Sequence, residues 1–80
     1  MQASRGIRVR KDLAGKALQT LRQLDLLDQN LRIRIIDDHL IAPISREPST
    51  EELEDLRKQF AEVVIETTQF QTRKIKSKTI

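Results

Sequence analysis

The chain has 80 residues, with 15 Lys and Arg, 12 Asp and Glu and no cysteine, which gives a formal net charge of +3. This length predicts one small domain with a modest core, and the lack of cysteine excludes a disulfide framework and a thiolate metal site. No apolar run approaches the roughly 18 residues that a membrane-spanning helix needs, and the first residues lack the apolar core of a signal peptide, so we expect a cytoplasmic protein.

The first two predicted elements are a strand over residues 7–11 and a helix that follows it. Arginine alternates with branched aliphatics in the strand, which is the period of a sheet with one buried face. Asp12 suits the N-cap position of the helix, in which apolar residues recur every three or four positions. We expect this helix to end between Asp25 and Asp28.

Residues 31–36 and 39–44 are predicted to form a β-hairpin. The first of these segments again interleaves arginine with leucine and isoleucine. Asp37-Asp38 suits the turn between them, because aspartate tolerates tight turn geometry. Pro43, near the end of the second strand, favours an edge or terminal position, because proline has no N–H to donate to a sheet.

A second helix is predicted to begin at Ser49, and a last strand covers residues 62–70. Ser49 and Glu52 stand three positions apart, which is the spacing of a capping box at a helix start. We expect residues 1–70 to form the domain. Residues 71–80 hold four basic residues and no acid, and we expect them to be a basic tail or the start of a linker.

The element order β-α-β-β-α-β favours an α+β fold, with one mainly antiparallel four-stranded sheet and two helices on one face. If the two arginine-rich strands pair, the other face carries four arginines together: Arg8, Arg10, Arg32 and Arg34. Because the planar guanidinium fork matches a phosphate group, this face is a candidate anion-binding surface. The alternative is a solvated charged face that protects against edge pairing.

Charge is distributed unevenly along the chain. Residues 1–34 carry eight Lys or Arg against three Asp or Glu, whereas residues 35–66 carry three against nine. Such asymmetry favours an anionic partner. Phe60 and Phe70 are the only aromatic residues, which argues against base stacking, so contacts to a nucleic acid would be to its backbone or shape.

No catalytic or metal-binding pattern is present in the sequence. The single histidine, His39, stands at the start of a predicted strand and is expected at the surface. Neither a histidine and carboxylate cluster with metal-ligand spacing nor a glycine-rich phosphate loop occurs. We therefore expect this chain not to be an enzyme by itself, and to hold no metal or cofactor.

Three landmarks in the sequence resemble a known family. They are a basic first strand from Gly6 to Lys11, a helix that ends in Leu26-Leu27-Asp28, and a hairpin that closes on Pro43-Ile44. In this order they resemble the small N-terminal domain of archaeal tRNA (guanine-N1)-methyltransferases, which methylate the guanine just 3′ of the anticodon. The related wybutosine-pathway aminocarboxypropyl transferases share a similar overall plan.

The resemblance implies a non-catalytic domain that docks on the outer corner of tRNA, where the D- and T-loops meet. It also implies a catalytic domain in the same polypeptide that uses S-adenosylmethionine, and we expect a monomer. Seven basic residues are the candidate RNA contacts: Arg8, Arg10, Lys11, Lys16, Arg22, Arg32 and Arg34.

A second hypothesis is a protein-interaction module. Four acids near the start of the second predicted helix contrast with the basic ends of the chain: Glu51, Glu52, Glu54 and Asp55. Such a helix would dock on a partner domain by charge complementarity. Both hypotheses hold together if this helix packs against the rest of an enzyme.

Overall fold

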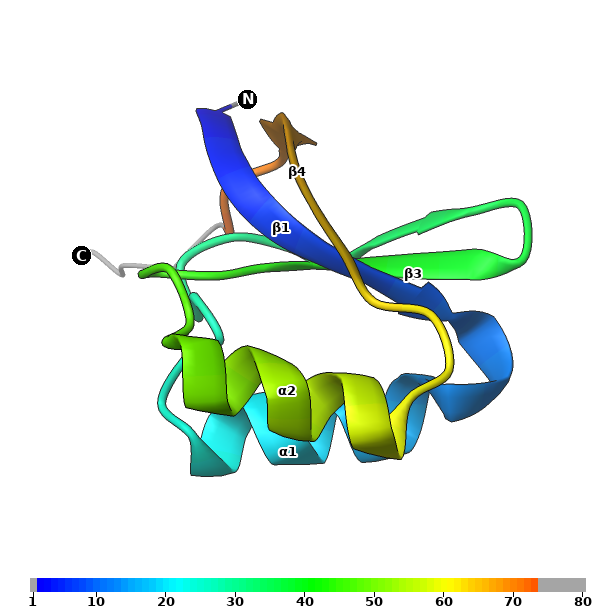
Figure 1. Ribbon diagram of the computed structural model, residues 1–80. Coiled ribbons are helices and arrows are strands. Elements are labelled where there is room, and N and C mark those ends of the chain that lie inside the picture. The colour runs from blue at the N-terminus through cyan, green and yellow to red at the C-terminus, as the bar shows by residue number, and fades with distance from the viewer. Residues whose placement is uncertain (1, 74–80) are drawn as a thin grey trace, which may run out of the picture.

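Four strands and two α-helices make up the part of the chain that the computed structural model describes, residues 2–73 (Figure 1). In chain order the elements are β1 (Gln2–Arg10), the 3-10 turn η1 (Lys11–Leu13), α1 (Ala14–Gln23), β2 (Arg34–Ile36), β3 (His39–Pro43), α2 (Thr50–Gln59) and β4 (Val64–Phe70). The sheet order is β2-β3-β1-β4, and each neighbouring pair is antiparallel. The predicted element order and the α+β class are therefore confirmed.

The main core lies between the sheet and the two helices, which cover the same face (Figure 1). Alternate positions of β1, Ile7 and Val9, point into it, as the period of two predicts. α1 contributes Leu21, α2 contributes Leu56, and Phe60 follows α2 directly. Burial of each side chain of this size contributes roughly 1.5–3 kcal/mol, so this core holds the helices on the sheet.

A second, smaller core lies on the opposite face of the sheet. Leu31, Ile41 and Phe70 pack together there and are 2%, 1% and 0% exposed. The chain beyond β4 turns back across this face, and Thr72 forms an isolated bridge with Leu31 (Figure 1). The sheet face opposite the helices is therefore partly covered by its own chain.

The strand predicted over residues 31–36 is shorter in the structure, because pairing with β3 begins only at Arg34. The preceding residues pair instead with the chain after β4. The Arg32 N–H donates to the Gln71 carbonyl at 2.8 Å, and the Arg73 N–H donates to the Asn30 carbonyl at 3.0 Å. Since β3 lies between β1 and β2, the direct pairing of the two arginine-rich strands is wrong.

The start of α1 also differs from the prediction. Leu13 occupies the N-cap position and makes no side-chain cap hydrogen bond. The Asp12 carboxylate lies 3.1 Å from the Arg10 guanidinium instead, so the predicted Asp12 cap is wrong. The predicted turn after β2 is confirmed: Asp37 has a φ of 54°, a left-handed conformation that aspartate tolerates.

The capping box at the start of α2 is confirmed. The Ser49 hydroxyl accepts from the Glu52 N–H at 3.1 Å, and the Glu52 carboxylate accepts from the Ser49 N–H at 2.9 Å. Arg46 donates to the same carboxylate at 2.9 Å and to the Leu24 carbonyl at 2.7 Å. One arginine thus ties the chain at the end of α1 to the first turn of α2.

These contacts predict how stability changes in acid. The Arg46 guanidinium, followed by the Ser49 N–H, stabilises the ionised Glu52 carboxylate and lowers its pKa from 4.5 to about 2. A carboxyl with a lowered pKa in the folded state stabilises the fold above its unfolded pKa, and this contribution is lost as the pH falls towards about 2. Glu52→Gln should therefore flatten the acid side of the stability profile while leaving the capping geometry possible.

Thermal unfolding between about pH 2 and pH 6 measures this effect. Glu54→Gln is the matched control, because it removes another carboxylate of α2 that makes no ion pair within residues 2–73. A Glu52→Gln profile as steep as that of the unaltered protein would contradict the assignment.

Candidate nucleic-acid interface

Arg8 and Arg34 lie on one face of the sheet although their strands do not touch. Both are aligned with Ile41 of β3, Arg8 from β1 and Arg34 from β2. Directly paired residues of antiparallel strands project to the same side, so the two arginines stand two strand spacings, roughly 10 Å, apart. Arg10 is on the same face and is aligned with His39.

The guanidinium groups of these arginines are engaged inside the domain. Arg8 Nη2 lies 3.1 Å from the Glu66 carboxylate. Arg34 Nη1 donates to the Thr68 hydroxyl at 2.8 Å and to the Gln69 carbonyl at 3.0 Å. Arg34 therefore links β2 to β4, the two outer strands of the sheet. Both arginines have structural roles, and binding phosphate would require them to give up or share these partners.

A second group of predicted residues lies around the start of α1. The Lys11 N–H donates to the Asp38 carbonyl at 2.8 Å, which places η1 beside the turn between β2 and β3. The side chains of Lys11 and Lys16 are exposed, and neither forms an ion pair with another residue in the described range. These two lysines are therefore free to meet an anion.

Arg22 and Arg32 are the other two predicted contacts, and they lie on different elements. Arg22 is in the last turn of α1, and a ten-residue helix is about 15 Å long. Arg32 precedes β2 by two residues and is not part of the sheet. Both side chains are exposed without an ion pair to any residue of 2–73. The seven predicted residues are therefore carried by β1, η1, α1, β2 and the segment before β2.

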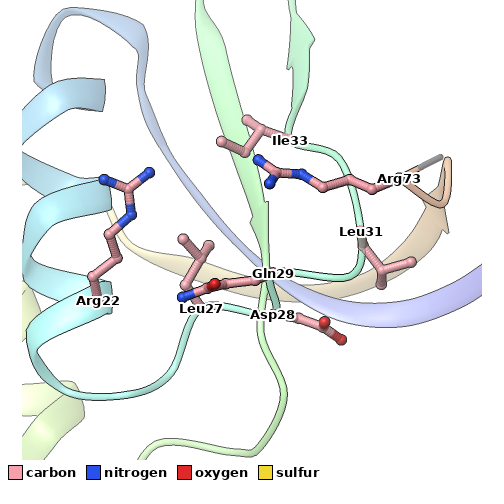
Figure 2. Close-up of a pocket in the computed structure, with 7 residues that line it drawn as sticks. All are labelled: Arg22, Leu27, Asp28, Gln29, Leu31, Ile33 and Arg73. Carbon is pink, nitrogen blue, oxygen red and sulfur yellow. The ribbon is translucent and has the colours of Figure 1, made fainter. Parts of the chain in front are cut away.

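Arg73, which was not among the predicted contacts, joins Arg22 at a hollow in the surface. The hollow has a volume of about 160 Å³, and its apolar part is formed by Leu27, Leu31 and Ile33. Figure 2 shows the guanidinium groups of Arg22 and Arg73 on opposite sides of this space. In sequence, the only sign of Arg73 was its position in the basic end of the chain, because the pairing that brings it here is tertiary.

Within residues 2–73 the structure contains neither a metal-binding cluster nor a membrane-spanning helix. No group of three or more His, Cys, Asp or Glu side chains is arranged to hold a metal ion within this range. No helix in the same range is long and apolar enough to cross a membrane.

The comparison with known families bears directly on these observations. The family model described as the tRNA methyltransferase 5 N-terminal domain matches residues 6–54, more than half of the 80 residues. The matched range runs from β1 into α2 and leaves β4 and Arg73 outside. No curated protein and no solved structure matches the chain. The family match establishes that the chain belongs to the tRNA methyltransferase 5 N-terminal domain family.

Proposed function

We propose that this domain binds tRNA for a tRNA guanine-N1 methyltransferase and takes no part in the chemistry. Its ligand is the outer corner of the folded tRNA, where the D- and T-loops meet, held through backbone and shape contacts. The observation that carries the proposal is the family match over residues 6–54.

The distribution of side chains supports contact with an RNA backbone. Seven basic residues are exposed without an ion pair in the part of the chain that the structure describes: Lys11, Lys16, Arg22, Arg32, Arg57, Lys58 and Arg73. Phe60 and Phe70 are 1% and 0% exposed, so neither aromatic ring is available to stack on a base. Because base stacking is excluded, the domain would recognise RNA through its phosphates and its shape. Folded RNA is usually recognised in this way when no exposed aromatic side chains are present.

The acidic surface of α2 supports a proposal for how the domain is oriented relative to tRNA and to the catalytic domain. This helix exposes three carboxylates, those of Glu51, Glu54 and Asp55. It covers one face of the sheet, and the second core lies on the opposite face (Figure 1). Because these carboxylates repel phosphate, tRNA approaches elsewhere, and α2 is the surface that docks on the catalytic domain of the same polypeptide. That domain would hold S-adenosylmethionine. A wybutosine-pathway transferase would use the same docking.

We expect the chain to bind a folded tRNA transcript more tightly than a transcript in which the D- and T-loops cannot pair. Chemical-shift titration of the isotope-labelled chain at low salt measures both affinities. Each contacted phosphate should add about 0.7–0.9 to the slope of log affinity against log salt. Equal affinity for the two transcripts contradicts corner recognition, and an absence of binding at any salt contradicts the proposed function.

A further inference from the structure

We propose that the hollow between α1 and residues 71–73 is a binding site for one phosphodiester group of an RNA backbone, with Arg22 and Arg73 as its two arms. This inference takes RNA as the ligand from the proposed function, but the site itself rests on separate observations. They are the charge, the shape and the rigidity of the hollow.

Within residues 2–73, neither arginine of the hollow forms an ion pair. Four other arginines form ion pairs within the domain: Arg5 with Glu47, Arg8 with Glu66, Arg10 with Asp12 and Arg46 with Glu52. Arg22 and Arg73 form none with any residue between 2 and 73. Two guanidinium groups that face one space without a counter-ion repel each other, and an anion between them removes this repulsion.

Asp28 also lines the hollow, but its carboxylate forms no ion pair with either arginine. Asp28 Oδ1 accepts from the Asn30 N–H at 2.9 Å, a local turn contact. Figure 2 shows the Asp28 carboxylate directed away from both guanidinium groups, and the Gln29 amide beside Leu27, below the two guanidinium groups in this view. Gln29 offers a further donor to a bound oxygen, and Asp28 does not oppose an anion directly.

The size of the hollow selects a small group. Sites that enclose a whole small-molecule ligand usually have volumes of roughly 300–1,000 Å³. At about 160 Å³ the hollow accommodates a phosphate group and not a complete nucleotide. Its apolar wall of Leu27, Leu31 and Ile33 keeps water from one side of the guanidinium groups, which strengthens their attraction for an anion.

Backbone contacts hold the two sides of the hollow in place. On the α1 side, the Leu26 N–H donates to the Leu21 carbonyl and the Asp28 N–H donates to the Pro43 carbonyl, each at 2.9 Å. On the other side, the Arg73 N–H is held by the Asn30 carbonyl. The backbone that carries each arm is thus held in place before any ligand arrives, so that binding has only the two side chains to order.

The position of Arg73 has a consequence for the domain boundary. Arg73 lies beyond the family match, which ends at residue 54, and it reaches the hollow only because residues 71–73 fold back on residues 30–32. The site is therefore complete only in a chain that continues past β4. A chain that ends at Phe70 would keep its sheet but lose one arm.

Titration with inorganic phosphate tests the hollow without RNA. The side-chain Nε–H resonances of Arg22 and Arg73 should shift with saturation, and the resonance of Arg57, an exposed arginine of α2, should not. Arg73→Ala should also reduce the response of Arg22, because both arms hold the same group. If the Nε–H chemical shifts of Arg22 and Arg73 change no more than that of Arg57, the hollow does not bind phosphate and the proposal is wrong.

Titration with the folded tRNA transcript tests the ligand. Arg22→Ala and Arg73→Ala should each weaken binding about tenfold, and Arg57→Ala, which removes the same charge from α2, should change it less than about twofold. The double variant of the two arms should lower the salt slope by about 0.7–0.9, the value for one phosphate. A decrease twice as large would mean two separate phosphates and overturn the shared site.

The two proposals fail in different ways. If tRNA binds and the double variant behaves like Arg57→Ala, the hollow is not a site and the proposed function stands. If inorganic phosphate shifts both arms and tRNA does not bind, RNA is wrong as the ligand and the proposed function fails. An amide spectrum of each variant that matches the unaltered chain confirms that the fold is retained.

Discussion

Replacing Phe70 with alanine is expected to lower the free energy of unfolding by about 3–5 kcal/mol, the range for removal of a buried aromatic ring. Phe70 has no exposed surface, and it packs with Leu31 and Ile41 in the second core. Small domains are stable by roughly 5–15 kcal/mol in total, so this single change removes a large share of the stability. Urea denaturation followed by circular dichroism measures it.

A milder variant keeps the prediction testable if the alanine protein does not fold. Phe70→Leu retains an apolar side chain, and we expect a folded protein in which the Arg32 and Arg73 amides exchange with solvent faster than in the unaltered chain. These amides report on the pairing of residues 30–32 with residues 71–73. A loss of less than about 1 kcal/mol in Phe70→Ala would show that the second core contributes little.

Gly6→Ala is expected to cost about 1–3 kcal/mol, although it adds only a methyl group. A Cβ atom at Gly6 would lie 2.7 Å from Phe70 Cζ and 3.0 Å from Ile41 Cγ2. Both neighbours are buried, so the ring has little room to move. The cost is steric and does not come from the backbone, because no described glycine has a positive φ.

Gly15 provides the matched control for this substitution. A Cβ atom there meets nothing within 4 Å, and Gly15 is in α1, where alanine is favoured over glycine by up to about 1 kcal/mol. Gly15→Ala should therefore stabilise the domain, while Gly6→Ala destabilises it. Thermal and urea unfolding of the two variants compare them. Equal stability of the two alanine variants would contradict the close packing of Phe70 against β1.

A double-mutant cycle would connect the two predictions. If the cost of Gly6→Ala comes from the Phe70 ring, that cost should shrink in the Phe70→Leu background. Additive effects would instead place the strain at Ile41 or at the Ala42 carbonyl, the other atoms near the added methyl group.

The arginines show what a residue pattern could and could not indicate: Arg8, Arg10 and Arg34 share one face of the sheet, although β1 and β2 do not pair directly. Alternation in residues 7–11 correctly indicated that Ile7 and Val9 are buried and that Arg8 and Arg10 point away from the helices. The partners of those arginines could not be inferred. Glu66, which neutralises Arg8, lies 58 positions further along the chain.

The sequence by itself determined the local features of this protein. Element order, the capping box at Ser49, the turn at Asp37 and the buried positions of β1 all depend on residues within one or two turns or strand repeats of each other. Family membership also rested on such short segments, since three local landmarks resembled the family that residues 6–54 match.

Only the tertiary structure decided which basic side chains are free and which of them meet. Strand order separates β1 from β2. The pairing of residues 71–73 with residues 30–32 brings Arg73 to the hollow beside Arg22, which is 51 positions earlier in the chain. No periodic pattern encodes contacts between residues so far apart, because they arise when a whole sheet closes on a second core. The burial of Leu31, Ile41 and Phe70 therefore determines where the candidate phosphate site forms.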